Sequence, residues 1–225
     1  MKTQNQEAPK PNLAAFYEQS KRSRAMLQGC TAGDAEAAAH LKKLLSEPCK
    51  LLTQALQSAE SGDVETLLAF LDNTTELSFV ADNIEWLKSI GKYETALLSA
   101  YIDTQTNYTN WSLDLLKFLF SIASRPALLA AGETLPGAGP FVVFRGVAGK
   151  GAKRRLRGLS WTDDRERAIW FANRYAETGL EKPAVMRAEV MPAQVYAFCD
   201  DRNEREFICD IGQAFPIKTE WRAGA

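Results

Sequence analysis

Apolar residues in the first half of the chain recur at the spacing of an α-helix. Between residues 12 and 125 they return every three or four positions, so each predicted helix has one apolar face. The pattern predicts a bundle of five or six helices, which forms a helical domain over residues 13–130. The clearest apolar stripe consists of Val64, Leu67, Leu68 and Leu71, at positions i, i+3, i+4 and i+7.

Glycine and proline divide this region into segments. Gly62-Asp63 stands before the stripe and Gly91 follows Ile90, and both are typical of helix boundaries. Arg125-Pro126 is a further boundary signal, because proline lacks the backbone N–H that the interior of a helix requires. The first 12 residues are polar and lack the apolar core of a signal peptide, so they are predicted to be a disordered tail.

The pattern changes after residue 130. Glycine and proline are concentrated over residues 131–140, which predicts a linker. Short runs of β-branched and aromatic residues follow at 141–144, 185–190, 195–198 and 207–211, and each is typical of a strand. One helix is predicted over residues 164–178, with Asp163 as its N-cap and Gly179 at its end. The fold class is therefore α+β, with a sheet domain at 141–225 after the helical bundle.

Composition limits the classes of protein that fit this pattern. The chain has 27 basic and 28 acidic residues, so it lacks the positive charge of a dedicated nucleic-acid-binding protein. Its four cysteines are scattered, and its one histidine, His40, is predicted to lie at a solvated helix position, so no metal site is expected. Charged residues and Pro126 interrupt the most hydrophobic stretch, residues 113–131, which therefore does not predict a membrane span. A soluble protein of the cytoplasm is expected.

The single histidine also limits the possible chemistry. Ser-His-Asp and Cys-His mechanisms would have to recruit His40 from the helical half, so a carboxylate-based mechanism fits better. Glu204 and Glu206 stand two residues apart, and in an extended segment both side chains would point to the same face. Such a pair suits a reaction that passes through an oxocarbenium ion. The alternative for these two residues alone is a solvated charge pair.

Two further segments contain candidate binding residues. Arg145 ends an apolar strand and can bind a phosphate with two parallel hydrogen bonds, while Gly146 would let a bulky ligand approach the backbone. Ser160 and Thr162 lie at a predicted strand-to-helix transition, with both hydroxyls on one side of an extended segment. Each segment also has an ordinary structural explanation, which is an ion pair for Arg145 and helix capping for Thr162.

The order of these segments resembles the arginine, serine, glutamate class of mono-ADP-ribosyltransferases. The resemblance covers roughly residues 141–211, with FRG at a strand end, GLSWT before a helix, and ERE before the last strand run. It implies a split mixed α/β domain that binds NAD⁺ as a co-substrate, without a metal. The chain would then be a glycosyltransferase that transfers ADP-ribose from NAD⁺ to a macromolecule.

The resemblance also implies a role for each matching residue. Glu206 matches the catalytic glutamate, and Glu204 matches the position where glutamate goes with arginine acceptors, so a protein arginine is the first acceptor to consider. Arg145, with Gly146 beside it, matches the residue that holds the phosphate or nicotinamide ribose of NAD⁺. Ser160 matches the serine that positions the catalytic glutamate.

The match in the serine motif is incomplete. Thr162 corresponds to its third position, but Trp161 replaces its small middle residue. In a regular strand the middle side chain points away from the ligand, so the replacement is compatible with binding.

Several alternatives remain open. Five basic residues lie between Lys150 and Arg157, which indicates either a solvated loop or a surface for nucleic acid, with a base as the acceptor and Trp161 or Tyr175 as stacking residues. Water as the acceptor would give an NAD⁺ glycohydrolase, and a binding module would need none of this chemistry. A regulatory partner of the helical domain, and a toxin or effector role in the cytoplasm of a target cell, are further hypotheses.

Overall fold

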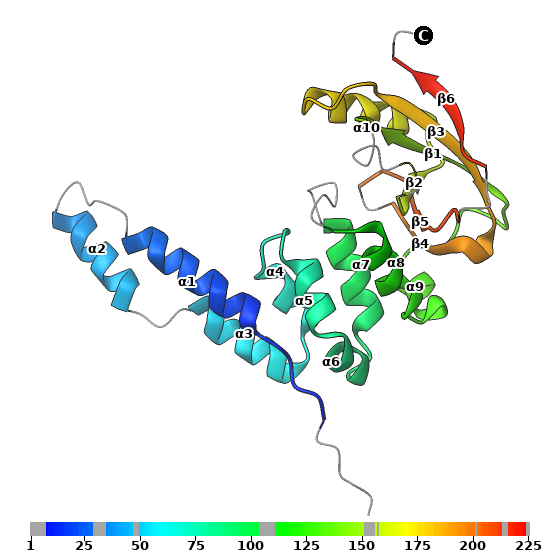
Figure 1. Cartoon of the computed structure of the whole chain (residues 1–225). Coiled ribbons are helices and arrows are strands. Elements are labelled where there is room, and N and C mark those ends of the chain that lie inside the picture. Colours follow the sequence, from blue (N-terminus) through cyan, green and yellow to red (C-terminus); the bar gives the residue numbers. More distant parts are fainter. Residues whose placement is uncertain are drawn as a thin grey trace, which may run out of the picture. The chain divides into compact units, whose positions relative to one another are not determined.

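The protein forms two compact units of different architecture in the computed structural model (Figure 1). The structure describes residues 8–28, 35–46, 50–103, 111–150, 156, 158–200, 202–212 and 216–223. Met1–Asn110 form the helical unit and Trp111–Ala225 form the sheet unit. Within the described ranges the fold comprises ten α-helices and a six-stranded antiparallel sheet, which confirms the predicted α+β class.

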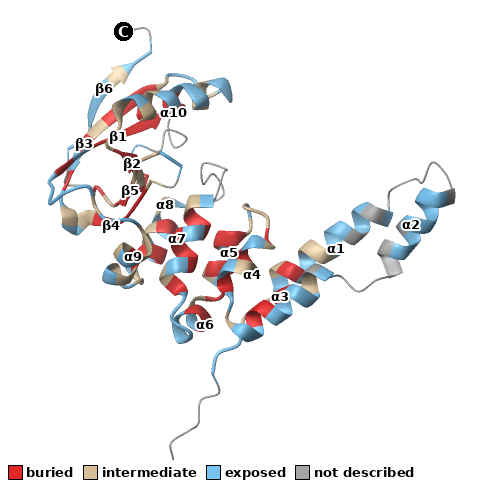
Figure 2. Cartoon of the chain, turned by 180° about the vertical axis from the view of Figure 1, so that it is seen from behind, coloured by how far each residue is buried: buried red, intermediate tan, exposed pale blue. Residues whose placement is uncertain are grey.

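The helical unit is built from short amphipathic helices whose apolar stripes pack on one another. Its helices are α1 (Ala14–Gln28), α2 (Ala35–Ser46), α3 (Lys50–Ser61), α4 (Val64–Ala69), α5 (Glu76–Asp82), α6 (Ile84–Ser89) and α7 (Tyr93–Asp103). All four residues of the predicted stripe are buried, which confirms it: Val64, Leu67, Leu68 and Leu71. The core is aromatic at its centre, where Phe79 makes edge-to-face contacts with Phe16 at 5.5 Å and Trp86 at 6.4 Å between ring centroids. Buried residues gather on α4 to α7 in Figure 2.

Two helix boundaries in this unit lie at the predicted signals. Asp63 is the N-cap of α4 and its carboxylate accepts the Thr66 N–H at 3.1 Å, while Gly91 adopts a positive φ just after α6. His40 is exposed on α2, as predicted. Of the predicted tail, residues 1–7 lie outside the described ranges, and Asn12 is held by the Asn83 side-chain amide, which donates to its carbonyl at 3.0 Å.

The sheet unit contains six strands in the order β4-β5-β2-β1-β3-β6, with every neighbouring pair antiparallel. Its strands are β1 (Phe141–Val147), β2 (Ser160–Thr162), β3 (Ala184–Val190), β4 (Val195–Cys199), β5 (Glu206–Cys209) and β6 (Lys218–Arg222), with a 3-10 turn, η2 (Pro192–Gln194), before β4. β1 and β3 pair over seven positions, whereas β1 and β2 pair only at Phe144 and Thr162. The sheet therefore consists of two groups of three strands joined at one residue pair.

Helix α10 (Arg165–Glu177) covers one face of β1 and β3, and Figure 1 shows it alongside these strands. Ala168 and Ala172 pack against Val185 and Phe144 on this face, whereas the opposite face holds a larger apolar core around Trp161 and Phe207. Gly179 ends the helix region with a φ of 87°, as predicted. The predicted N-cap is wrong by one residue, because Asp164 caps the helix by accepting the Glu166 and Arg167 N–H groups.

Two helices that the sequence analysis assigned to the helical domain pack on the sheet. α8 (Leu113–Ser121) and α9 (Arg125–Ala131) belong to the sheet unit, which begins at Trp111. Lys117 forms an ion pair with Asp210 at 2.7 Å, and Phe120 stacks on Tyr196 of β4 at 5.2 Å. These contacts anchor α8 to β4 and to the end of β5.

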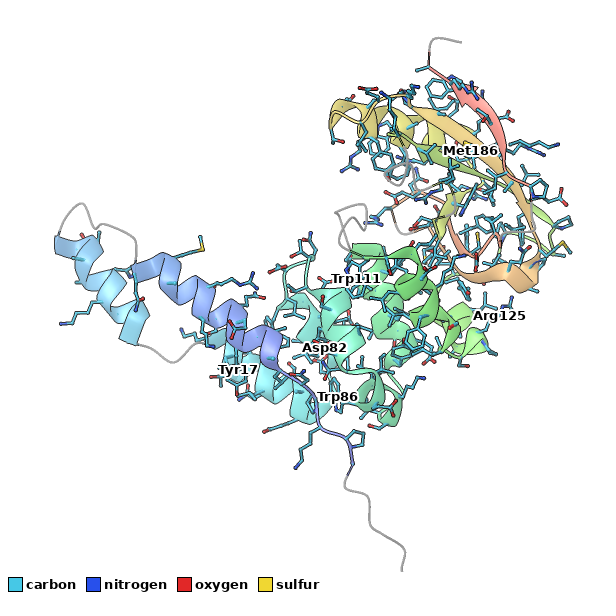
Figure 3. The ribbon with its side chains drawn as sticks, viewed as in Figure 1. Tyr17, Asp82, Trp86, Trp111, Arg125 and Met186 are labelled. Carbon is cyan, nitrogen blue, oxygen red and sulfur yellow. The ribbon has the colours of Figure 1, made fainter. Side chains whose placement is uncertain are left out.

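The Arg125-Pro126 pair, predicted as a boundary signal, marks the start of a helix. Arg125, labelled in Figure 3, is the first residue of α9, and Pro126 occupies the first turn, where its missing N–H costs nothing. The Arg125 Nε donates to the Val195 carbonyl at 3.1 Å, and its guanidinium also contacts the Pro192 carbonyl. Residues 131–140, predicted as a linker, also contact the sheet, because Leu135 packs against its core and the Glu133 N–H donates to the Phe198 carbonyl at 2.7 Å.

Two strands were not among the predicted strand runs. β6 has the sequence KTEWR and is almost wholly exposed, so it lacks the apolar pattern by which strands are recognised. β2 has only three residues and was predicted only as a transition into the helix. None of the helices in the described ranges is long and apolar enough to cross a bilayer.

Glu76 is a buried carboxylate in the core of the helical unit. Its side chain is 7% exposed, and its Oε2 atom has no hydrogen-bond partner among the described residues. Burial, together with the charges of Asp103 and Asp72, raises the pKa of Glu76 to about 7. Between the unfolded pKa of 4.5 and pH 7, the folded helical unit therefore retains a proton that its unfolded chain releases.

This proton predicts a pH-dependent stability that Glu76→Gln removes. Because the pKa is higher in the folded state, the contribution of Glu76 is most favourable below pH 4.5 and is lost as the pH rises toward 7. From pH 5 to pH 8, the free energy of unfolding of the wild type should fall by about 2 kcal/mol relative to Glu76→Gln. Urea unfolding followed by circular dichroism measures the difference. Glu85→Gln, a change at an exposed residue, serves as control. If the difference in unfolding free energy between the wild type and Glu76→Gln stayed constant with pH, the raised pKa of Glu76 would be contradicted.

Candidate functional site

Arg145 lies at the junction between the two groups of strands. It belongs to the interior of β1, which extends to Val147, so the expectation that it ends the strand is wrong. The side chain is 9% exposed, and its Nη1 donates to the carbonyl of Ser160 on β2. The guanidinium thus bridges β1 and β2 beyond the one position at which these strands pair.

Gly158 leaves room for this guanidinium. A Cβ atom at residue 158 would lie 2.3 Å from Arg145 Nη2 and 2.5 Å from Cζ. The Gly158 carbonyl also accepts the indole N–H of Trp161 at 2.7 Å. Gly158 therefore leaves space for the arginine and binds the tryptophan, a role that the sequence analysis did not assign.

Gly146 has a packing role in this structure. A Cβ atom there would lie 2.3 Å from the Ala168 carbonyl oxygen and 2.6 Å from the Ala172 nitrogen, both in the backbone of α10. The neighbour that approaches the Gly146 backbone is therefore helix α10. The absence of a side chain at residue 146 is explained by close helix packing, whereas the sequence analysis had explained it by a ligand.

The two hydroxyls of β2 both contact the segment that contains Glu204 and Glu206. Ser160 forms a side-chain hydrogen bond with Glu206, which is the first residue of β5. Thr162 donates to the Glu204 carbonyl at 2.8 Å and accepts the Asp164 N–H at 3.0 Å. Ser160 therefore contacts a carboxyl group, while Thr162 holds the backbone and helps to begin α10.

Several neighbouring groups act on the Glu206 carboxyl. Withdrawal from water raises its pKa, and the charge of Glu204 adds to this effect. The Ser160 hydrogen bond and the positive charges of Arg202 and Arg145 act in the opposite direction. The structure thus brings Arg145, Ser160, Glu204 and Glu206 into one electrostatically coupled group, although they are up to 61 residues apart (206 − 145) in the sequence.

The reason predicted for the pairing of Glu204 with Glu206 is wrong. β5 begins at Glu206, and the residues before it form a turn in which Asn203 and Arg205 adopt positive φ values of 55° and 48°. The segment is not extended, so residue alternation does not place the two carboxylates. Glu204 instead lies in the turn, where its carboxylate is 3.5 Å from Arg202 Nη2.

Arg202 and Arg205 were missed by the sequence analysis. Arg202 pairs with Glu204 and lowers the pKa of Glu206, and Arg205 forms a bidentate pair with Asp163, with both N···O distances at 2.6 Å. Only the alternation of charge in DDRNERE could have indicated such pairing from the sequence.

The outer face of α10 presents an exposed tryptophan. Trp170 is 46% exposed, and the guanidinium groups of Arg167 and Arg174 lie 5.6 and 5.2 Å from its ring centroid. Arg167 also donates to the Asn203 carbonyl at 2.8 Å, which places this face beside the turn that contains Glu204. Trp161, predicted as a stacking residue, is 2% exposed and cannot stack on a ligand.

Other predicted features contribute little to the site. The basic segment from Lys150 to Arg157 lies outside the described ranges except for Lys150, which pairs with Glu181, and Leu156. Cys199 and Cys209 are buried, whereas Cys30 and Cys49 are outside those ranges. Among the described residues, no group of three or more histidine, cysteine, aspartate and glutamate side chains could hold a metal ion.

Comparison of the chain with protein-family models, with curated proteins and with solved structures found no match.

The packing role of Gly146 predicts that Gly146→Ala destabilises the sheet unit. The added Cβ would meet backbone atoms of α10, which can yield only if the helix moves, so stability should fall by about 2–3 kcal/mol. Gly137→Ala is the matched control, because a Cβ there has no neighbour within 4 Å. Thermal unfolding of both variants tests the prediction, and equal melting temperatures would contradict it.

Proposed function

We propose that the protein is a mono-ADP-ribosyltransferase that cleaves NAD⁺ at the site around Glu206. The observation that supports this most directly is the group formed by Arg145, Ser160 and Glu206, in which a buried guanidinium and a serine hydroxyl both act on one carboxyl. These are the three residue types, in the same chain order, on which the family resemblance rests.

The arrangement of the sheet also supports the proposal. The groups β4-β5-β2 and β1-β3-β6 meet only at Phe144 and Thr162, as expected of a split sheet. Arg145, Ser160 and Glu206 come from β1, β2 and β5, which surround this junction. A ligand bound there would meet side chains from both groups.

In the proposed reaction, the bond between the nicotinamide nitrogen and ribose C1′ breaks, and its electron pair leaves with nicotinamide. Positive charge develops on the ribose, and Glu206 stabilises it by accepting a hydrogen bond from a ribose hydroxyl. Ser160 orients the Glu206 carboxylate, and Arg145 binds the anionic part of NAD⁺ through its charged N–H groups. An acceptor nitrogen then forms the new bond to C1′, and Glu204 takes the proton that the acceptor loses.

The acceptor class follows from Glu204. A carboxylate beside the reaction centre attracts and orients a guanidinium, so a protein arginine is the leading acceptor. One observation favours a second class, a base in single-stranded nucleic acid. Trp170 with Arg167 and Arg174 combines an exposed ring for stacking with two cations for phosphates, beside the turn that contains Glu204.

Among the residues that the structure describes, those of this site all belong to the sheet unit, and none belongs to the helical unit. We assign it to the binding of a regulatory partner, and we place the enzyme in the cytoplasm, either of the cell that makes it or of a target cell in which it acts as a toxin.

Labelled NAD⁺ tests the proposal. The wild type, incubated with a cell lysate, should transfer label to a macromolecule, and Glu206→Gln should lower turnover by about a hundredfold or more, since the lost charge acts mainly in the transition state. Protease sensitivity of the label identifies a protein acceptor, nuclease sensitivity identifies a nucleic acid, and free ADP-ribose identifies water. Glu204→Ala should abolish transfer to arginine.

The control is Glu85→Gln, an exposed change in the helical unit, which should leave transfer unchanged. Absence of NAD⁺ consumption by the wild type would overturn the proposal. Label that survives Glu204→Ala but is lost in Glu206→Gln would overturn the assignment of arginine as the acceptor.

The raised pKa of Glu206 predicts a characteristic pH profile. Since the carboxylate form is the active one, kcat/KM should fall as the pH drops through the Glu206 pKa, which lies above the usual value for glutamate. The Ser160 hydrogen bond stabilises the carboxylate, so Ser160→Ala should move this acidic limb to higher pH. Ser121→Ala, a change on the exposed surface of α8, is the control and should leave the limb in place. A limb unmoved by Ser160→Ala would exclude this role of Ser160.

A further inference from the structure

The turn that contains Asp200 and residues 202–205 is bonded to its surroundings at several points. The Asp200 N–H donates to Glu133 Oε1 at 2.8 Å, and the Asp200 side chain accepts the Arg205 N–H at 3.1 Å. Inside the turn, the Asn203 N–H donates to the Asp200 carbonyl at 2.7 Å. These bonds close the turn on itself and attach its first residue to the segment before β1.

Arg205 fastens the far end of the turn to the start of α10. Its Nε and Nη2 donate to the two carboxylate oxygens of Asp163, each at 2.6 Å, which is the bidentate geometry that fixes orientation as well as distance. The guanidinium also lies 5.8 Å from the centroid of the Phe198 ring. The backbone of Arg205 has a φ of 48°, a conformation that non-glycine residues rarely adopt without support from their surroundings.

The two candidate catalytic carboxylates are held by different means. Glu206 belongs to β5 and is paired in register with Thr162 on one side and Cys199 on the other. Glu204 lies outside the strand, between Asn203 and Arg205, and depends on the turn for its position. The Arg205–Asp163 pair fixes this turn together with the Thr162 hydrogen bond to the Glu204 carbonyl, so its loss would loosen the hold on Glu204 while Glu206 stays in the sheet.

We propose that the Arg205–Asp163 pair is a positioning device that holds Glu204 for acceptor transfer and so determines how cleaved NAD⁺ is divided between the acceptor and water. The proposal rests on the proposed function and names residues that act through Glu204. Both outcomes break the same bond from nicotinamide to C1′. In transfer the acceptor nitrogen bonds to C1′ and loses a proton to Glu204, whereas in hydrolysis a water oxygen bonds to C1′ and loses a proton to solvent.

The pair is suited to positioning and not to general stability. The side chains of Arg205 and Asp163 are 40% and 23% exposed, and ion pairs with this much solvent contact add little to the stability of a fold. Removing the pair should therefore leave the melting temperature nearly unchanged, which separates its effect from unfolding.

The test compares Asp163→Asn with the wild type in two measurements. Hydrogen exchange should become faster at the amides of residues 202–205, while the amides of Phe207 and Ile208 in β5 stay protected. Transfer of label from NAD⁺ to the acceptor should fall by about tenfold, with little change in total NAD⁺ cleavage, so that free ADP-ribose increases. Asp163→Glu, which keeps the carboxylate, should restore part of the transfer.

Glu166→Gln is the matched control, since it breaks another ion pair at the start of α10, the 2.8 Å contact with Arg165. It should change neither exchange in the turn nor the ratio of transfer to hydrolysis. Equal exchange rates in Asp163→Asn and the wild type would overturn the positioning role by itself. A wild type that leaves NAD⁺ intact would overturn the proposed function, and with it the effect on the ratio, even when the exchange result is as expected.

Discussion

The bridge from the Arg145 guanidinium to β2 is the interaction on which the rest of the site depends. β1 and β2 share one paired position, and beyond it the buried cation of Arg145 binds the Ser160 carbonyl. A charge with so little access to water needs hydrogen-bonding partners, so the two strands cannot close into a regular ladder at this point. The same separation brings a serine hydroxyl and a carboxyl to the junction.

The electrostatic balance around Glu206 results from this junction. Its carboxyl is withdrawn from water, which favours the protonated form, while Ser160, Arg202 and Arg145 favour the carboxylate. Opposing effects of this kind are typical of groups whose protonation matters to their chemistry. By contrast, burial and two further carboxylates raise the pKa of Glu76 in the helical unit, and no cation is among the causes. The consequence of this shift is a change in stability with pH.

The parts of the fold that could be predicted from the sequence are those fixed by local periodicity. The stripe from Val64 to Leu71 and the helix that ends before Gly179 depend on spacing and on one glycine, and both are confirmed. The parts that could not be predicted depend on partners distant in the sequence. Asp163 and Asp164 are both suitable N-caps by residue type. The Asp163 carboxylate binds Arg205, and Asp164 caps the helix.

The candidate site shows the same division. The order of Arg145, Ser160 and Glu206 is visible in the sequence, because Arg145 and Glu206 stand beside strand patterns and Ser160 stands before a helix pattern. The turn around Glu204 could not be predicted from the sequence, because its shape follows from two positive φ values and from contacts with Asp163, Thr162 and Glu133. The role of Gly146 also depends on a helix that begins 19 residues later (165 − 146), which no local pattern reveals.

The contact between Glu133 and Asp200 has a consequence for the smallest part of the chain that can be studied alone. Glu133 precedes the first strand, yet its carboxylate accepts the N–H of the residue at which the turn begins. α8 and α9 lie still earlier and contact β4 and the end of β5 through Lys117, Phe120 and Arg125. A fragment cut at Phe141 would contain all six described strands but would lack the Glu133 contact with the turn and the helices that pack on β4. The natural minimal fragment begins no later than Trp111, where the sheet unit itself begins.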